Sequence, residues 1–314
     1  MSKIPVIFDC DPGVDDTFAL GLLASCNLFD IKGITAVYGN MPLSKTAYNA
    51  KALAHAFGID CPVAVGADKP LFKLFSRGED YVSPIHGSTG IGDLLLPCPR
   101  DAYYPKDAAE LIYEEAVKAN GKLTLIAVGP LTNVAIALKR YPGLSNLIDK
   151  FYIMGGGINM GNQTPFAEAN ICKDPSAAAI CFEQLETYMV GLNATHEAEL
   201  TKEDFDEMRS ACGDGKGGSV IKSVIDFSVK NAFERGSDSN IIHDALAVAW
   251  IMQPSLCEDD FAYVYVEDRL DFVNNGETVK DNSKGAPNCH IAMNTDKDGF
   301  KDIMVGMCRY FADK

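Results

Sequence analysis

The N-terminal part of the chain contains the stretch Ile4-Pro5-Val6-Ile7-Phe8-Asp9-Cys10-Asp11-Pro12-Gly13-Val14-Asp15-Asp16. It starts as an apolar run rich in β-branched residues, which predicts a buried strand over 4–8. The Pro12-Gly13 pair predicts a turn, and the apolar pattern after it predicts a helix over 16–25. A strand that turns directly into a helix is the building unit of folds in which helices connect parallel strands.

The same alternation continues through the first two thirds of the chain. Further strands are predicted at 31–38, 63–65, 123–128, 151–154 and 188–192, and helices at 43–57, 106–120, 132–139 and 175–184. From 201 to about 250 the pattern is mostly helical, with a glycine-rich break at 213–218; strands follow at 261–266 and 290–293, and a closing helix at 298–311. We therefore expect an α/β fold with a single open, mainly parallel, doubly wound sheet flanked by helices, and a helical cap near 200–250. No repeat or long linker divides the chain, so residues 1–314 are predicted to form one domain.

The chain is strongly acidic, with 28 Lys and Arg against 43 Asp and Glu and a formal charge of −15. This charge argues against binding to nucleic acid or to anionic membranes, and favours a small neutral ligand or a cation. No apolar run reaches the roughly 18 residues that a membrane span needs. The ten cysteines occur singly without a C-x-x-C pair, and no signal-peptide pattern is present, so we expect a cytoplasmic protein.

Four carboxylates lie within the eight residues that follow the first strand: Asp9, Asp11, Asp15 and Asp16. Carboxylates brought this close repel one another and raise one another's pKa unless a cation neutralises them. Oxygen ligands suit a hard divalent cation, Ca²⁺ or Mg²⁺. Ligands of doubly wound sheets bind at the carboxyl ends of the strands, where this cluster is expected.

The acidic stretch resembles the N-terminal signature of the nucleoside hydrolases, Ca²⁺-dependent enzymes that cleave ribonucleosides to base and ribose. The resemblance extends in family order over nearly the whole chain. Further matching blocks are Tyr38-Gly39-Asn40, His86-Gly87-x-x-Gly90, Val128-Gly129-Pro130-Leu131-Thr132-Asn133, Met154-Gly155-Gly156 with Gly161-Asn162, Glu168-x-Asn170 and His243-Asp244-x-Leu246-Ala247. The helical region near 200–250 then corresponds to a cap on the substrate side.

This resemblance implies roles for individual residues. The Ca²⁺ ligands would be Asp11, Asp16, the backbone carbonyl of Val128, and Asp244. Asp11 would also act as the general base toward water, a role that the cation supports. The ribonucleoside would be held by a further set of residues, namely Asp15, Asn40, Met154, Asn162, Glu168 and Asn170. Acidic residues around the sugar would stabilise the oxocarbenium-like transition state of N-glycosidic cleavage.

The base side of the predicted site is less well defined. His243 matches a position that protonates the departing base, and His86 is a second candidate for the base pocket. Arg235 is a further candidate contact on the segment 227–235, which corresponds to a mobile helix in relatives. Ala169 stands where many family members have an aromatic residue, so the preference for purine or pyrimidine is left open.

Two alternatives remain open at this stage. Asp9-x-Asp11 after a strand also resembles the nucleophile motif of Mg²⁺-dependent phosphohydrolases of the haloacid dehalogenase type, although Gly13 stands where these usually have Thr or Val. The other alternative is a non-catalytic protein that binds nucleosides or sugars on the same fold. Family members are commonly dimers or tetramers, so the resemblance also implies a homodimer or homotetramer.

Overall fold

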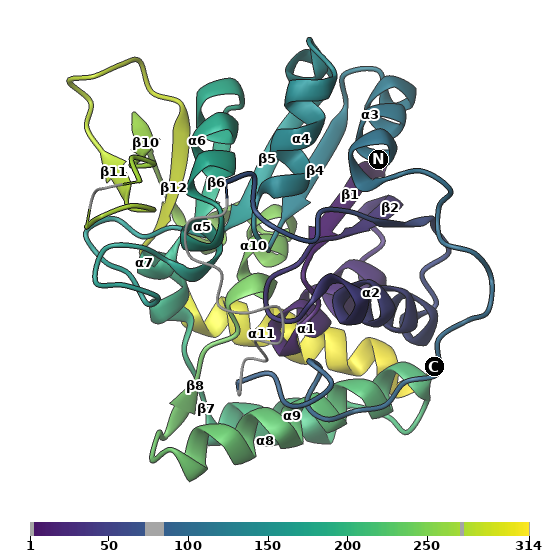
Figure 1. Cartoon of the computed structure of the whole chain (residues 1–314). Coiled ribbons are helices and arrows are strands. Elements are labelled where there is room, and N and C mark those ends of the chain that lie inside the picture. The colour runs from purple at the N-terminus through teal and green to yellow at the C-terminus, as the bar shows by residue number, and fades with distance from the viewer. Residues whose placement is uncertain (1–2, 73–84, 271–272, 314) are drawn as a thin grey trace.

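The computed structural model describes residues 3–72, 85–270 and 273–313 (Figure 1). Its centre is an eight-stranded sheet in the order β3-β2-β1-β4-β5-β6-β12-β9. The strands are β1 (Ile4–Cys10), β2 (Phe29–Ala36), β3 (Val63–Val65), β4 (Leu123–Ala127), β5 (Ile148–Met154), β6 (Thr187–Val190), β9 (Glu258–Ala262) and β12 (Cys289–Met293). All neighbouring pairs are parallel except β12 with β9, so β9 is an antiparallel edge strand. The expected α/β class with a mainly parallel, doubly wound sheet is confirmed.

Strand β1 shows why this chain forms a two-sided sheet. Its side chains alternate between the two faces, so that Val6 and Phe8 enter one apolar core and Ile7 enters the other. All three side chains are fully buried. A strand that is apolar on both faces must lie inside a sheet covered on both sides, which is the position that β1 takes.

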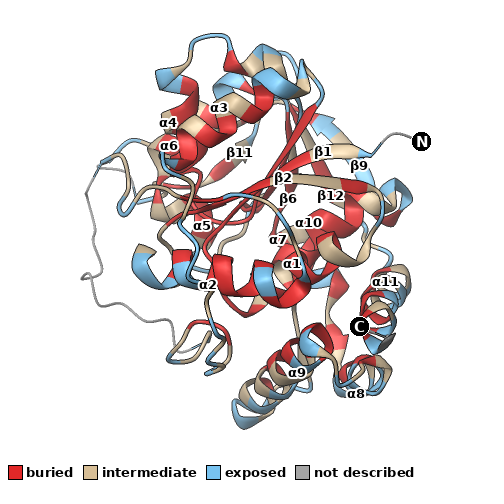
Figure 2. Ribbon diagram, turned by 90° about the vertical axis from the view of Figure 1, so that its right-hand side faces the viewer, coloured by how far each residue is buried: buried red, intermediate tan, exposed pale blue. Residues whose placement is uncertain are grey.

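Helices cover both faces of the sheet (Figure 2). One layer consists of α3 (Ala108–Ala119), α4 (Thr132–Arg140) and α6 (Pro175–Gln184). The opposite layer consists of α1 (Val14–Ser25), α2 (Leu43–Phe57), α10 (His243–Met252) and α11 (Lys297–Tyr310), and α8 (Lys202–Ala211) and α9 (Lys216–Glu234) pack outside it. The shorter elements are α5 (Ala169–Lys173), α7 (Leu192–Thr195), β7 (Leu200–Thr201), β8 (Ser239–Asn240), β10 (Val264–Val266) and β11 (Thr278–Lys280).

The path of the chain places a switch point next to β1. From β1 the chain proceeds outward through β2 to β3, and it then returns to β4 on the other side of β1 before proceeding to β5 and β6. At such a point the two connections leave in opposite directions, which opens a crevice at the carboxyl ends of the two central strands. Asp11 follows β1 and Val128 follows β4, so both lie at this crevice.

The region near 200–250 is helical as expected, but its helices differ in their role. Helix α10 is buried along most of its length and packs against α1 and β5, so it belongs to the core layer. Helices α8 and α9 lie outside it, and Phe227 of α9 would contact a side chain added at Gly87 or Gly92. The cap is thus formed by α8 and α9, because the apolar sequence of α10 requires burial on all sides.

The structure also corrects one predicted strand. The predicted strand at 261–266 is divided between β9, on the edge of the main sheet, and β10, which pairs with β11 in a separate antiparallel ribbon. Within the described residues, no helix is both long and apolar enough to cross a membrane.

Candidate active site

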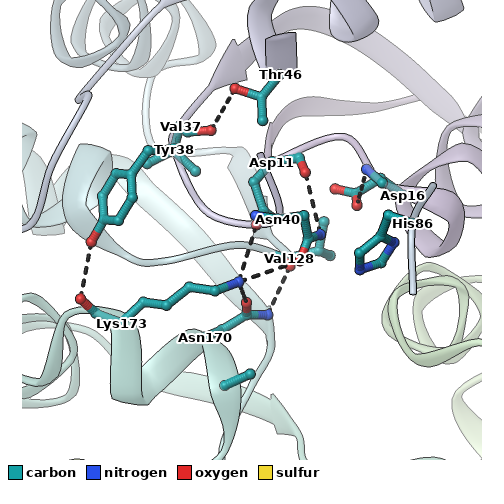
Figure 3. Close-up of polar contacts among 12 residues, drawn as sticks. Asp11, Asp16, Val37, Tyr38, Asn40, Thr46, His86, Val128, Asn170 and Lys173 are labelled. Atoms are coloured by element: carbon teal, nitrogen blue, oxygen red, sulfur yellow. Dashed lines mark hydrogen bonds and ion pairs between the residues drawn. The ribbon is translucent and has the colours of Figure 1, made fainter. Parts of the chain in front are cut away.

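Asp11 follows β1 at the switch point and is fully buried, and Figure 3 shows the polar residues around it. Its Oδ2 accepts a hydrogen bond of 2.7 Å from the backbone N–H of Asn40. Its Oδ1 is also buried but has no hydrogen-bond donor in the part of the chain that the structure describes. Gly39 and Gly129 pack against the carboxyl group, and a Cβ on Gly129 would lie 2.7 Å from Oδ1. These two glycines allow the backbone to surround Asp11 closely.

Two helices direct three more carboxylates to the same place. Asp15 and Asp16 lie in the first turn of α1, and Asp244 lies in the first turn of α10, which packs against α1. Asp16 Oδ2 accepts from the backbone N–H of Gly13 at 2.8 Å, while its Oδ1 is buried without a donor. Carboxylates in the first turn of a helix are stabilised by the helix dipole, which partly offsets their mutual repulsion.

The electrostatics of this cluster follow from burial. Desolvation, followed by repulsion from the neighbouring carboxylates, raises the pKa values of Asp16 and Asp244 well above the ordinary range. Desolvation also raises the pKa of Asp15 to about 7, and it raises the pKa of Asp11. Among the residues that the structure describes, no three His, Cys, Asp or Glu side chains are arranged closely enough to hold a metal ion as they stand. The carboxylates thus converge on one place without being in ligand geometry.

Asp9, the fourth carboxylate of the N-terminal cluster, is hydrogen-bonded to neighbouring elements of the fold. Its Oδ1 accepts from Thr35 Oγ1 at 2.5 Å and from Asn133 Nδ2 at 2.7 Å. Desolvation raises its pKa to about 7. The side chain connects β1, β2 and α4 through Oδ1, whereas its Oδ2 is buried without a donor among the described residues.

The side chain of Asn170 connects the carboxyl ends of β4 and β5. Its Nδ2 donates to the carbonyl oxygens of Val128 at 2.9 Å and Met154 at 3.1 Å. The side chain of Met154 is buried beside it. A carbonyl oxygen has two lone pairs, so Val128 can accept from Asn170 and still ligate a cation.

Lys173 is a site residue that the sequence analysis missed. Its Nζ lies 3.4 Å from Asp11 Oδ2, 3.3 Å from Asn40 Oδ1 and 3.4 Å from Asn170 Oδ1 (Figure 3). The one signal in the sequence is its spacing of three residues from Asn170 within α5, which places both side chains on one helix face.

Glu168 and Asn162 hold the short helix α5 in place. Glu168 is its N-cap, and its carboxylate accepts from the backbone N–H groups of Asn170 and Ile171 and from Gly156. Asn162 is exposed, and its Oδ1 accepts from the N–H of Ala169 at 2.9 Å. Both predicted sugar contacts therefore position the helix that carries Asn170 and Lys173.

Two histidines lie beside the acidic cluster. The backbone N–H of His243 donates to Asp15 at 3.1 Å, and its Nδ1 is 2.9 Å from Thr195 Oγ1. His86 Nδ1 accepts from the N–H of Val14 at 3.1 Å. Desolvation lowers the pKa of His243 to about 4 and that of His86 to about 3, so both rings are neutral at pH 7.

Arg235 lies apart from these residues. It is exposed at the C-terminal end of α9, and its side chain makes no polar contact with another described residue. Of the predicted base-side contacts, His86 and His243 are thus hydrogen-bonded to residues of α1, whereas Arg235 has no such contact among the described residues.

The doubly wound sheet and the buried acidic cluster at its switch point are typical of an α/β enzyme. The family described as inosine-uridine preferring nucleoside hydrolase matches residues 6–302 of the chain. The chain belongs to this family, and the protein is accordingly a hydrolase.

Known relatives match along almost the whole chain. A pyrimidine-specific ribonucleoside hydrolase RihA from Citrobacter koseri is 33% identical over 98% of this chain and 99% of its own. Among solved structures, a purine-preferring ribonucleoside hydrolase from Gardnerella vaginalis has a TM-score of 0.89 and 28% identity, covering 99% of this chain and 100% of its own. A plant nucleoside hydrolase has a TM-score of 0.88 and 27% identity, covering 98% and 99% of the two chains.

Proposed function

We propose that the protein hydrolyses the N-glycosidic bond of ribonucleosides to free base and ribose, with Ca²⁺ as its cofactor. The observation that carries this proposal is the pair of buried oxygens without a donor, Oδ1 of Asp11 and Oδ1 of Asp16, beside Asp244 at the switch point. The named relatives act on ribonucleosides but differ in the base, since one group is pyrimidine-specific and another protein is purine-preferring. The base preference of this chain therefore needs a direct measurement.

The residues present fit a hard divalent cation. An unpaired buried carboxylate oxygen is costly, and a cation held by Asp11 and Asp16 would remove that cost for Oδ1 of each. Asp11, Asp16, Asp244 and the carbonyl of Val128 offer oxygen ligands alone, which suits Ca²⁺. When bound, the cation lowers the pKa of an attacking water.

The side chains of the site are assigned to proton transfer, ribose binding and charge stabilisation. Asp11 is held by the N–H of Asn40 and takes the proton of the attacking water. Asp15, Asn40 and Asn170 present oxygen atoms to the ribose. The negative charge of the cluster stabilises the positive charge that develops on the sugar as the bond to the base breaks.

The departing base is assigned to the side of the site that carries the histidines. A neutral imidazole is a weak acid, so His243 acts by passing a proton from solvent to the base. Its Nδ1 contacts Thr195, which leaves Nε2 for the base. His86 lies on the same side, on a loop that packs against Phe227 of α9.

The test is direct. The purified protein is incubated with Ca²⁺ and inosine, uridine, adenosine, guanosine or cytidine, and reducing sugar is assayed with an EDTA-treated sample as control. Ribose release from at least one nucleoside is expected, and Asp11→Asn should lower kcat about a hundredfold or more. Absence of ribose with retained nucleoside binding would indicate a binding protein, whereas phosphate release from phosphomonoesters would indicate a phosphohydrolase.

We further propose that residues 1–314 form one domain, and that the protein is cytoplasmic and assembles as a homodimer or homotetramer. Light scattering coupled to size-exclusion chromatography measures the assembly. A mass of one chain, 33.9 kDa, would contradict the last part of this proposal.

A further inference from the structure

Lys173 places a positive charge inside the acidic site. It is the last residue of α5, and its side chain extends into the crevice so that Nζ lies among three oxygen atoms (Figure 3). The side chain is 22% exposed, whereas that of Asp11, its partner in the ion pair, is 1% exposed. The ammonium group therefore reaches the edge of the buried cluster from the solvent side.

The contacts of Asp11 are divided between its two oxygens. Oδ2 accepts from the N–H of Asn40 and faces the ammonium group of Lys173 at 3.4 Å. Oδ1 receives no hydrogen bond. Two donors on one oxygen fix the rotation of the carboxyl group, so that the other oxygen is directed to the place where a water or a cation would be needed.

The same ammonium group orients two asparagine side chains. The Nδ2 atom of Asn40 donates to the carbonyl of Asp11 at 3.3 Å, and that of Asn170 donates to the carbonyl of Val128 at 2.9 Å. Their Oδ1 atoms both face Lys173 Nζ. One positive charge thus holds the general base and two predicted sugar contacts in a single arrangement.

The charge of Lys173 has a second consequence. Asp11, Asp16 and Asp244 are the proposed carboxylate ligands of the divalent cation, and the ammonium group lies beside one of them, Asp11. A fixed positive charge repels a second cation at short range. The ion pair that aligns Asp11 therefore also weakens the binding of the cation.

We propose that Lys173 is a positioning residue that aligns Asp11 for catalysis and, by its charge, lowers the affinity of the site for the divalent cation. This inference deepens the proposed function and rests on it. It predicts that removal of the charge changes metal affinity and turnover in opposite directions. A side chain that only packed against the site would weaken both or neither.

The experiment uses Lys173→Met, which keeps much of the length and removes the charge, with Lys139→Met on the exposed end of α4 as a matched control. Calorimetric titration of metal-free protein with CaCl₂ alone should show about tenfold tighter binding for Lys173→Met, the scale of one charge interaction screened as in water. At saturating Ca²⁺, kcat for ribose release should fall about tenfold or more, because the base is no longer held in place, with a smaller change in KM. Lys173→Arg should restore both values toward those of the wild type, and Lys139→Met should change neither.

Lys173→Gln, which is neutral but retains an N–H donor, gives the same test if the Met variant does not fold. It should bind Ca²⁺ as tightly as Lys173→Met and keep more of the turnover. Unchanged or weaker Ca²⁺ binding in both neutral variants overturns the inference, as does an unchanged kcat. A wild-type protein that binds no Ca²⁺ overturns the proposed cofactor as well, so the wild-type titration distinguishes the two failures.

Discussion

Gly39 offers a sharp test of how closely the backbone surrounds Asp11. A Cβ at this position would overlap Asp11 Oδ2 and would lie 2.7 Å from Asp11 Cγ. Gly39 is not among the residues with a left-handed backbone, so alanine is compatible with its conformation. The whole effect of Gly39→Ala should therefore act through the position of the Asp11 carboxyl group.

The magnitude follows from the geometry. Carbon atoms pack at about 3.5 Å or more, so the carboxyl carbon must retreat by about 0.8 Å from its 2.7 Å distance. A misplacement of about 1 Å at a reacting group costs roughly a hundredfold in rate, or about 2.7 kcal/mol in the activation free energy. We expect kcat/KM of Gly39→Ala to fall by about this factor.

The assay is ribose release at saturating Ca²⁺, together with thermal unfolding of the same samples. Gly306→Ala is the matched control, because a Cβ at Gly306 in α11 meets no atom within 4 Å. The control should keep full activity and gain about 0.5 to 1 kcal/mol of stability from the helix propensity of alanine. Activity of Gly39→Ala within threefold of the wild type would refute the assignment of Asp11 as the positioned general base.

Three further predictions concern stability and the cation. Asp9 has a pKa of about 7 in the folded protein against a usual 3.8, so the folded state binds the extra proton, and this group alone should lower the stability by about 1.4 kcal/mol between pH 6 and pH 8. In Asp9→Asn, chemical denaturation should show a fall in stability that is smaller by this amount. Asp244→Asn removes one of the mutually repelling buried carboxylates, so the metal-free variant should melt at a higher temperature than the metal-free wild type. The rise in Tm that Ca²⁺ causes in the wild type should be lost in this variant. A rise in Tm on adding Ca²⁺ equal to that of the wild type would exclude Asp244 as a ligand. Glu168→Ala leaves the N–H groups of Gly156, Asn170 and Ile171 without their acceptor, so urea denaturation should show a loss of about 2 kcal/mol and the KM for nucleoside should rise.

Much of the fold could be predicted from local pattern. The helices α2 and α6 and the strand β3 begin and end where the sequence predicts, because their apolar spacing and flanking residues are local signals. The ribbon of β10 and β11 could not be predicted in the same way. Its pairing joins Val266 to Thr278, which are twelve positions apart in the chain, so no two-residue turn connects the paired strands.

The candidate site, like the fold, could be predicted from the sequence only in part. The resemblance to nucleoside hydrolases named Asp11, Asp16, Asp244 and Asn170, and the structure places these residues together at the switch point. It did not separate residues that face the crevice from those that support it, such as Glu168, whose carboxylate caps α5. Arg235 was named from its position along the chain and lies exposed.

The sequence by itself determined the mainly parallel sheet, the acidic cluster after β1 and the family, because short local patterns and the order of the motifs are enough to predict all three. Only the tertiary structure decided that Oδ1 of Asp11 is left without a donor among the described residues and that Lys173 faces its other oxygen, Oδ2. The physical reason is that charge interactions depend on distance in space and on burial. Asp11 and Lys173 form an ion pair although they are 162 positions apart in the chain, so no local sequence pattern predicts their contact.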